Sequence, residues 1–252
     1  MPFAGLGLHI LLALFCAVHV VRTGQQLYWL FILFAFPLLG SVVYFFAVYL
    51  PNSRLERGAM KAVSAAVRAI DPTREVREAR QAYEDAPTAQ NRLRLAAALL
   101  DVGEAPAAVR EYEACLAGPF AADPEIRFGL ARAYVESQRF ADALRLLEPL
   151  RVERADFRPE PVALLAARSL AGSSRHTEAR QAFEAAVAAY GTYESRAELA
   201  IYAFATGDTA TTDRLMPELE RIAARWNPLT RELNELVARR LDAARTLAAR
   251  RP

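Results

Sequence analysis

The sequence predicts an all-α chain: an N-terminal two-helix transmembrane hairpin, then an α-solenoid of about four helix pairs and a C-terminal capping helix. Two observations predict this fold. Residues 1–52 contain a single charged side chain, Arg22, whereas the rest of the 252-residue chain is rich in Arg, Glu, Asp and Ala. Amphipathic segments of helical period then recur in pairs over residues 88–226. The first part of the chain is therefore suited to lipid and the second to water.

Two apolar segments, residues 3–21 and 27–50, are predicted to span the membrane as a hairpin with a turn at 22–26. The second segment, as a helix, would be about 36 Å long, which exceeds a hydrocarbon core of about 30 Å. Pro37 and Gly40 near its middle are tolerable because a neighbouring helix can cover the loosened backbone. A cleaved signal peptide is the alternative for residues 3–21, but no Lys or Arg precedes Arg22.

Basic residues follow the second apolar segment and predict the orientation of the hairpin. They are Arg54, Arg57, Lys61 and Arg68. Because cytoplasmic flanks carry the excess of Lys and Arg, we expect both termini in the cytoplasm. Residues 53–87 are assigned to a juxtamembrane basic helix, which lies on anionic headgroups or simply continues the span, and to a half-repeat that packs on the first helix pair.

The stretch LYWLFILFAFPLLGSVVYFF, residues 27–46, resembles the N-terminal membrane hairpin of phospholipase D-type nucleases and cardiolipin synthases. That family also has an aromatic-rich span in which Pro is followed closely by Gly and Tyr. Its chemistry needs a His-x-Lys motif, in which His attacks a phosphodiester. The residues two places after the three histidines of this chain are Leu11, Val21 and Glu178. The resemblance therefore extends to the hairpin and not to the reaction.

The helix pairs align on an alanine that recurs at intervals of 35 and 36 residues, at Ala108, Ala143 and Ala179. A large apolar residue follows each alanine four places later. These residues are Tyr112, Leu147 and Phe183. Cys115, Leu150 and Ala186 occupy the next turn of the same face. The interhelix turns carry Gly103, Gln138, Ser174 and Gly207 at equivalent places. We therefore expect one packing arrangement to repeat along residues 88–226.

This pattern resembles the tetratricopeptide repeat, a helix–turn–helix unit of about 34 residues. The resemblance implies that the small alanine lets two helices cross closely and that the turn adopts a positive backbone angle. The fourth unit departs from the pattern, since Thr212 stands where the alanine is expected. Residues 227–252 are predicted to form a polar helix that caps the array, together with a short tail.

No motif of catalysis, cofactor binding or metal binding is present in the sequence. The two cysteines, Cys16 and Cys115, form no CxxC pair, and we expect each to be a buried inert thiol. His9 and His19 lie in the first apolar segment without an acidic partner, and His176 is expected at a solvated turn. The net charge of +2, with Arg interleaved among Glu and Asp, argues against nucleic acid. We predict no cofactor, no small-molecule substrate and no enzymatic activity.

In tetratricopeptide arrays the first helix of each unit lines a concave groove that holds a peptide or a partner helix. Arg132 and Arg168 occupy matching positions on such helices here, and Arg94 lies nearby in the preceding unit. Their guanidinium groups, with Phe128, are the predicted partner-binding residues, suited to acidic side chains or a terminal carboxylate. The alternative is structural: Phe128 belongs to the core, and the arginines are neutralised within the array. The acidic residues named for that role are Glu125, Glu136 and Glu198.

The chain as a whole resembles membrane-anchored repeat proteins of bacteria. This resemblance implies a multi-pass protein of the bacterial inner membrane that acts as a scaffold for a partner protein on the cytoplasmic side. The alternative is an accessory subunit of a larger membrane complex, which would contact its partners through the hairpin. The lipid bilayer and one or more proteins are the partners that the sequence predicts.

Overall fold

The computed structural model describes residues 71–117 and 122–250, with Phe120 between them, and nearer the N-terminus the helix α2 (Tyr28–Ala35) and the single positions 14, 18, 22 and 43. The chain divides into two compact units, Met1–Pro72 and Thr73–Pro252.

In the first unit the structure describes mainly α2, and the sequence of this helix, YWLFILFA, is entirely apolar or aromatic. Phe31 and Phe34 on this helix are 76% and 90% exposed. No helix within the described residues is long and apolar enough to cross a membrane. The predicted spans 3–21 and 27–50, apart from α2 and a few single positions, and the basic stretch 54–70 lie outside the described residues.

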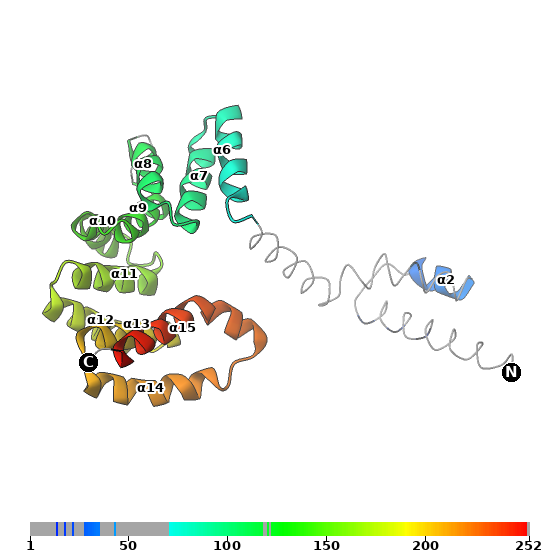
Figure 1. Ribbon diagram of the computed structural model, residues 1–252. Coiled ribbons are helices and arrows are strands. Elements are labelled where there is room, and N and C mark those ends of the chain that lie inside the picture. The colour runs from blue at the N-terminus through cyan, green and yellow to red at the C-terminus, as the bar shows by residue number, and fades with distance from the viewer. Residues whose placement is uncertain are drawn as a thin grey trace. The chain divides into compact units, whose positions relative to one another are not determined.

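The second unit is built from ten helices between residues 74 and 249, and no strand occurs in the described part of the chain (Figure 1). The helices are α6 (Arg74–Asp85), α7 (Ala89–Asp101), α8 (Ala105–Leu116), α9 (Pro124–Glu136), α10 (Phe140–Glu153), α11 (Pro159–Gly172), α12 (His176–Tyr190), α13 (Tyr193–Thr206), α14 (Thr209–Ala223) and α15 (Pro228–Ala249). The predicted all-α class is confirmed for the residues that the structure describes.

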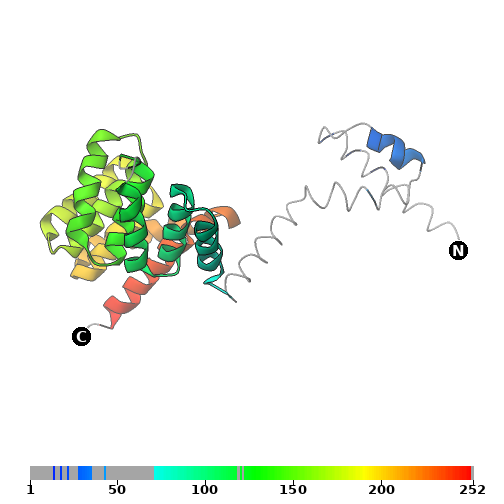
Figure 2. The ribbon, with the colours of Figure 1, turned by 90° about the horizontal axis from the view of Figure 1, so that it is seen from above.

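From α6 to α14 each helix packs against the next one along the chain. The first helices of the four pairs are α7, α9, α11 and α13, and consecutive members of this set also contact one another. The second helices are α8, α10, α12 and α14. This arrangement is an α-solenoid, in which each pair packs mainly on its neighbours (Figures 1 and 2). The last helix, α15, packs on α13.

The recurring alanines lie in the hydrophobic core of the array. Ala108, Ala143 and Ala179 are each fully buried, with 0% exposure. The residues four and seven places after them are buried as well. These residues are Tyr112, Leu147, Phe183, Cys115, Leu150 and Ala186. The sequence alignment of the first three pairs is thus confirmed by their packing.

Two glycines on first helices allow aromatic rings of neighbouring helices to lie against the backbone. A Cβ atom added to Gly129 of α9 would come within 2.6 Å of the Tyr112 ring. One added to Gly172 of α11 would come within 2.5 Å of the Phe140 ring. Tyr112 and Phe140 can therefore occupy these positions only because the glycine opposite each ring has no side chain.

The turn inside each helix pair contains one residue with a positive φ angle. These residues are Gly103 (83°), Gln138 (59°), Ser174 (59°) and Gly207 (75°). The four sequence positions identified as equivalent thus share one left-handed conformation, as the repeat pattern predicts. Glycine adopts this conformation freely, whereas Gln138 and Ser174 do so at a cost in backbone strain.

Side-chain caps and prolines explain where several helices begin. Asp123 accepts hydrogen bonds from the backbone N–H groups of Glu125 and Ile126, and Pro124 opens α9. Thr88, Thr192, Asp208 and Asn227 cap α7, α13, α14 and α15 in the same way. These oxygens satisfy N–H groups that have no partner within the helix.

Candidate functional site

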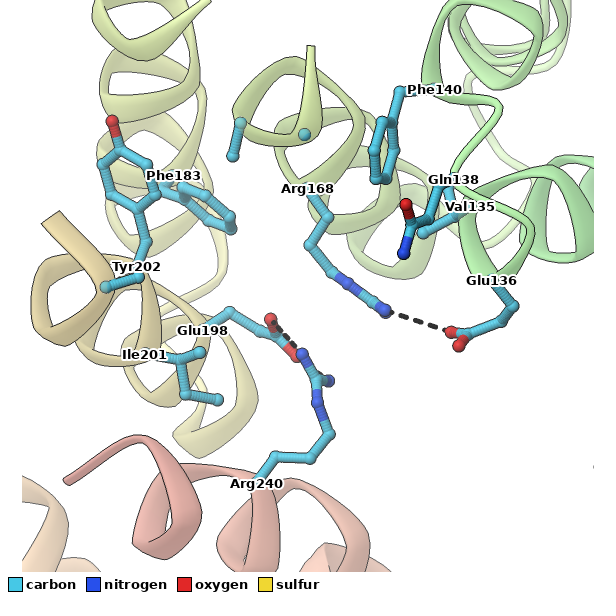
Figure 3. Close-up of a pocket in the computed structure, with 13 residues that line it drawn as sticks. Val135, Glu136, Gln138, Phe140, Arg168, Phe183, Glu198, Ile201, Tyr202 and Arg240 are labelled. Carbon is cyan, nitrogen blue, oxygen red and sulfur yellow. Dashed lines mark hydrogen bonds and ion pairs between the residues drawn. The ribbon is translucent and has the colours of Figure 1, made fainter. Parts of the chain in front are cut away.

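A cavity of about 390 Å³ opens between α9, α11 and α13, and α15 contributes to its wall (Figure 3). Its apolar lining includes Phe140, Phe183 and Ile201. Its polar lining consists mainly of charged side chains from the first helices and from α15, so the cavity offers an apolar surface with charges around it.

Two ion pairs define the polar part of the cavity. Arg168 of α11 lies 3.3 Å from a carboxylate oxygen of Glu136 on α9. Arg240 of α15 donates to both carboxylate oxygens of Glu198 on α13, at 2.5 and 3.2 Å. The Glu198 side chain is only 4% exposed, whereas Glu136 is 57% exposed. The first pair is therefore solvated and readily exchanged, while the second is a buried structural contact.

The sequence around Glu198 explains why α15 is held on α13. Glu198 lies between the buried residues Ala197 and Leu199. A carboxylate in such surroundings is costly to bury without a cationic hydrogen-bond donor. Val237 and Leu241 of α15 supply apolar contact with the same core cluster, and Arg240 between them supplies the donor.

A second contact holds the start of α15 close to α13. The rings of Tyr193, the first residue of α13, and of Trp226, just before α15, meet edge to face with centroids 4.5 Å apart. Asn227 then accepts a hydrogen bond from the backbone N–H of Thr230 at 2.8 Å and caps the helix. The loop after α14 is thus directed back over the first-helix side of the array.

The predicted partner-binding residues occupy four different environments. Arg168 lines the cavity. Arg132 is exposed and makes no ion pair with any residue that the structure describes. Arg94 is paired with Glu75 and Glu78 of α6, at 2.8 and 3.9 Å.

Phe128 is buried, with 7% exposure, and its ring meets that of Phe157 edge to face at 6.1 Å. The guanidinium of Arg158 lies 5.7 Å from both ring centroids. This position corresponds to the core alternative that the sequence left open for Phe128.

The acidic residues expected to neutralise the arginines have separate partners. Glu136 pairs with Arg168, as the structural alternative anticipates. Glu125 instead pairs with Arg158 at 3.0 Å, and Glu198 with Arg240. Arg132 is therefore the cation of the predicted set that no carboxylate within the described residues neutralises.

Arg240 is the site residue that sequence reasoning missed. Residues 227–252 read as a polar capping helix, and nothing in the repeat pattern indicated which face of the array they cover. One signal was available: Glu198 lies in the apolar stretch AELAIYAFA and requires a cation from elsewhere in the chain. Val237 and Leu241, four residues apart on one helix face, indicate which side of α15 is buried.

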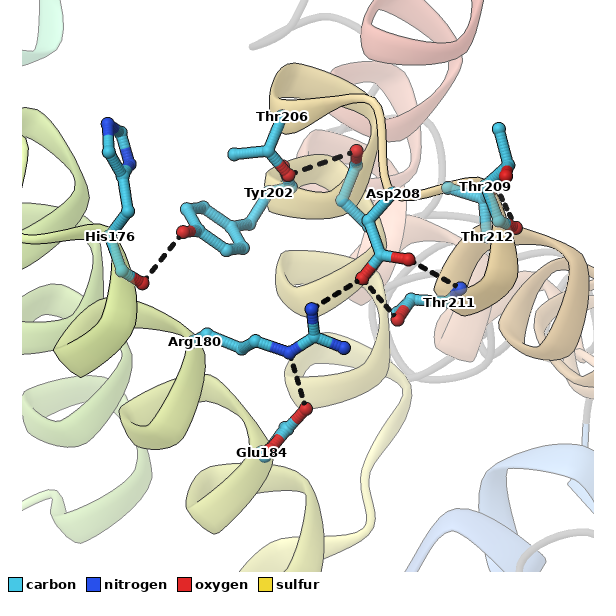
Figure 4. Close-up of polar contacts among 10 residues, drawn as sticks. His176, Arg180, Glu184, Tyr202, Thr206, Asp208, Thr209, Thr211 and Thr212 are labelled. Atoms are coloured by element: carbon cyan, nitrogen blue, oxygen red, sulfur yellow. Dashed lines mark hydrogen bonds and ion pairs between the residues drawn. The ribbon is translucent and has the colours of Figure 1, made fainter.

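A second polar cluster joins α12 to the turn before α14 (Figure 4). Asp208 accepts hydrogen bonds from the hydroxyl and the backbone N–H of Thr211, at 2.7 and 3.1 Å, and pairs with Arg180 at 3.0 Å. These hydrogen bonds, the one from the hydroxyl first, hold the pKa of the Asp208 carboxyl below its ordinary value. The Tyr202 hydroxyl donates to the carbonyl of His176 at 2.9 Å. The polar groups of this cluster form hydrogen bonds and an ion pair with one another. The cluster therefore holds the fourth helix pair, α13 and α14, against α12.

The remaining candidate groups have structural surroundings. Cys115 is buried with 4% exposure, and burial raises the pKa of its thiol, as expected for an inert cysteine. His176 is exposed at the start of α12. No group of three or more His, Cys, Asp or Glu residues in the described part of the chain could hold a metal ion. Cys16, His9 and His19 lie outside the described residues.

Comparison with known proteins identifies the repeat. No curated protein and no solved structure matches the chain. A family model described as "Tetratricopeptide repeat" matches residues 99–168, from the end of α7 to Arg168 on α11. This segment contains the first two recurring turns, at Gly103 and Gln138, and the first two recurring alanines, Ala108 and Ala143. Residues 99–168 are thus similar in sequence to the tetratricopeptide repeat, and their helices pack as consecutive helix–turn–helix pairs.

Proposed function

We propose that the chain is a membrane-anchored adaptor, which binds a partner protein on the face formed by its first helices and holds it close to the membrane. Tetratricopeptide repeats are typically protein-binding modules, and the fold is generally a non-catalytic scaffold. The observation that carries the proposal is the cavity between α9, α11 and α13, where apolar residues adjoin an exchangeable arginine.

Two arginines of the first helices suit an acidic segment of the partner: Arg168 lines the cavity, and Arg132 lies on α9 outside the lining. Arg132 has no ion pair to give up among the described residues. Arg168 would exchange Glu136 for a carboxylate of the partner at little cost, because an exposed pair of this kind contributes about 0–1 kcal/mol. Phe140 and Ile201 in the cavity would receive an apolar side chain next to that carboxylate. The proposed ligand is therefore an acidic peptide or helix with one large apolar anchor.

Residues 1–52 carry the proposed anchoring. Their single charge and their two long apolar segments favour a hairpin in a bacterial inner membrane. The basic residues that follow favour cytoplasmic repeats. An anchored array confines its partner near the bilayer and raises its effective concentration there without requiring a tighter binding site.

Binding is tested with the full chain, purified in mild detergent and probed with the protein that co-purifies most strongly with it. Arg132→Glu/Arg168→Glu is expected to weaken binding of that protein at least about 30-fold, because two attractive charges become repulsive. Arg151→Glu/Arg214→Glu makes the same charge change on the second helices α10 and α14 and is the matched control. Equal affinity of the two double variants would show that the first-helix face is not the binding surface.

Anchoring is tested separately by extraction of membranes with alkaline carbonate. The full chain is expected to remain in the pellet, and a chain without residues 1–52 is expected in the supernatant. Protease added to intact spheroplasts should leave the repeats uncut. Release of the full chain by carbonate would contradict the anchor, and digestion in intact spheroplasts would contradict the cytoplasmic orientation.

A further inference from the structure

Helix α15 carries a row of exposed leucines along one side. Leu229, Leu233, Leu236 and Leu247 are 57%, 76%, 75% and 61% exposed. Arg240 and Ala243 continue the row, so its members follow one another at intervals of four, three, four, three and four residues. This alternation is the spacing of a helix seam that packs against another helix. We refer to these six positions as the leucine stripe.

The leucine stripe is not the face by which α15 packs on its own array. That face is formed by Val237 and Leu241, which are 8% and 3% exposed. At 100° per residue, these two residues lie about 100° around the helix from the centre of the stripe. Arg240 is the one stripe residue that turns aside, toward Glu198. Helix α15 thus has two apolar faces, and the described part of the chain covers one of them.

We propose that the leucine stripe is the seam of a homodimer, in which the α15 helices of two copies pack antiparallel. The proposal is independent of the partner-binding function. An antiparallel pair places Leu233 against the partner subunit's Leu236 and, by the twofold symmetry, Leu236 against the partner subunit's Leu233. The methylene stem of Arg240 then lies beside the partner subunit's Leu229, while its guanidinium keeps Glu198.

Charges beside the stripe select this register. Glu232 and Arg239 flank it on the side away from α13, seven residues apart. In the antiparallel register Glu232 faces the partner subunit's Arg239, so two attractive pairs form across the seam. A shift by one heptad would instead bring the two Arg239 side chains together. A parallel pair would stack Arg240 on Arg240 and leave Glu232 opposite an apolar residue.

The same charges disfavour a lipid surface as the occupant. An interfacial membrane helix is typically flanked by Lys and Arg, which attract anionic headgroups. The leucine stripe is flanked instead by Glu232, Glu235 and Arg239, a mixed and self-complementary set. A second copy of this chain is the partner that such a set fits.

The dimer is tested by sedimentation equilibrium of the full chain in a density-matched mild detergent. The wild-type chain is expected to dimerise. Leu233→Glu/Leu236→Glu is expected to lower the association constant at least about 100-fold, since four leucines leave the seam. Both leucines are exposed in the single copy, so the variant should fold, with unchanged circular dichroism and thermal unfolding. A wild-type chain that is monomeric at about 100 μM would overturn the proposal, as would a double variant that associates like the wild type.

The register has its own controls. Leu247 lies beyond the overlap of the two helices, so Leu247→Glu should associate like the wild type, and a loss of association would overturn the antiparallel register.

Glu232→Arg and Arg239→Glu each create two like-charge pairs and should weaken self-association about tenfold. An equimolar mixture of the two variants should form a heterodimer of wild-type strength, because the exchanged charges are then complementary. Failure of the mixture to associate would equally overturn the register.

Discussion

The guanidinium of Arg240 on α15 donates two hydrogen bonds to the carboxylate of Glu198 on α13, at 2.5 and 3.2 Å. The carboxylate is almost fully buried, and the guanidinium is 35% exposed. This contact joins the last helix to the fourth repeat across 42 residues of sequence. Together with Val237 and Leu241, which pack in the same core cluster, it holds α15 on α13.

Removal of Arg240 is expected to destabilise the array. Arg240→Ala leaves a buried carboxylate without a partner, a change that costs about 3–5 kcal/mol where both ions are fully buried. Because Arg240 is partly solvated, we expect a loss of about 2 kcal/mol in the free energy of unfolding, measured by urea denaturation. Glu198→Gln/Arg240→Met, which removes both charges, should recover most of this loss. A loss below about 0.5 kcal/mol in Arg240→Ala would show that water solvates Glu198.

Stability should also respond to the backbone conformation of the interhelix turns. Ser174 has a φ angle of 59°, a conformation that costs non-glycine residues about 1 kcal/mol or more. Ser174→Gly is therefore expected to raise the free energy of unfolding by about 0.5 kcal/mol. The gain is smaller than the strain that is relieved, because glycine increases the conformational entropy of the unfolded chain.

The reverse change provides the control for this prediction. A Cβ atom at Gly103 would meet nothing within 4 Å, so Gly103→Ala tests the positive φ angle without a steric clash. It should lower the free energy of unfolding by about 0.5 kcal/mol, because the lower chain entropy of alanine offsets part of the strain. Changes of the same sign in Ser174→Gly and Gly103→Ala would contradict the shared turn conformation.

Stability at high pH should depend on Tyr134. Its hydroxyl donates a hydrogen bond to Glu113 at 2.7 Å, and burial together with this hydrogen bond raises its pKa to about 12. The folded state therefore retains the proton more strongly than the unfolded chain, whose tyrosine has a pKa of about 10. The stabilisation is complete below pH 10 and is lost as the pH rises from about 10 to about 12.

Tyr134→Phe isolates this effect. The variant should lose about 1 kcal/mol of stability at pH 8, since it lacks a hydrogen bond to a charged group that is itself half exposed. Its stability should then fall less steeply than that of the wild type between pH 9 and 11.5, when both are followed by urea denaturation. Parallel curves for the two proteins would mean that Tyr134 titrates normally.

Much of the repeat architecture could be predicted because it depends on local rules. The interval between Ala108, Ala143 and Ala179 predicts one core position that recurs in each pair, and all three alanines are fully buried. The positive φ angle of the turns could also be predicted, since Gln138 and Ser174 adopt the conformation of the glycines with which they align. Both properties are fixed within one repeat and need no knowledge of the rest of the chain.

The candidate site was less predictable because it depends on which distant charges meet. Helix period placed Arg132 and Arg168 on first helices. It could not show that Glu136 pairs with Arg168 and that Arg132 has no ion pair among the residues that the structure describes. The docking of α15 depends on the Glu198–Arg240 contact, which no repeat rule encodes. The predicted spans 3–21 and 27–50 stay predictions, since they lie largely outside the described residues.

The docking of α15 on α13 would also limit the length of the ligand in the proposed binding mode. Arg240 of α15 lines the cavity between α9, α11 and α13, so a polypeptide bound along the first helices would meet the last helix at the fourth repeat. Under the proposed function, the array would therefore favour a ligand that ends or turns at this point over a long extended segment that continues past it.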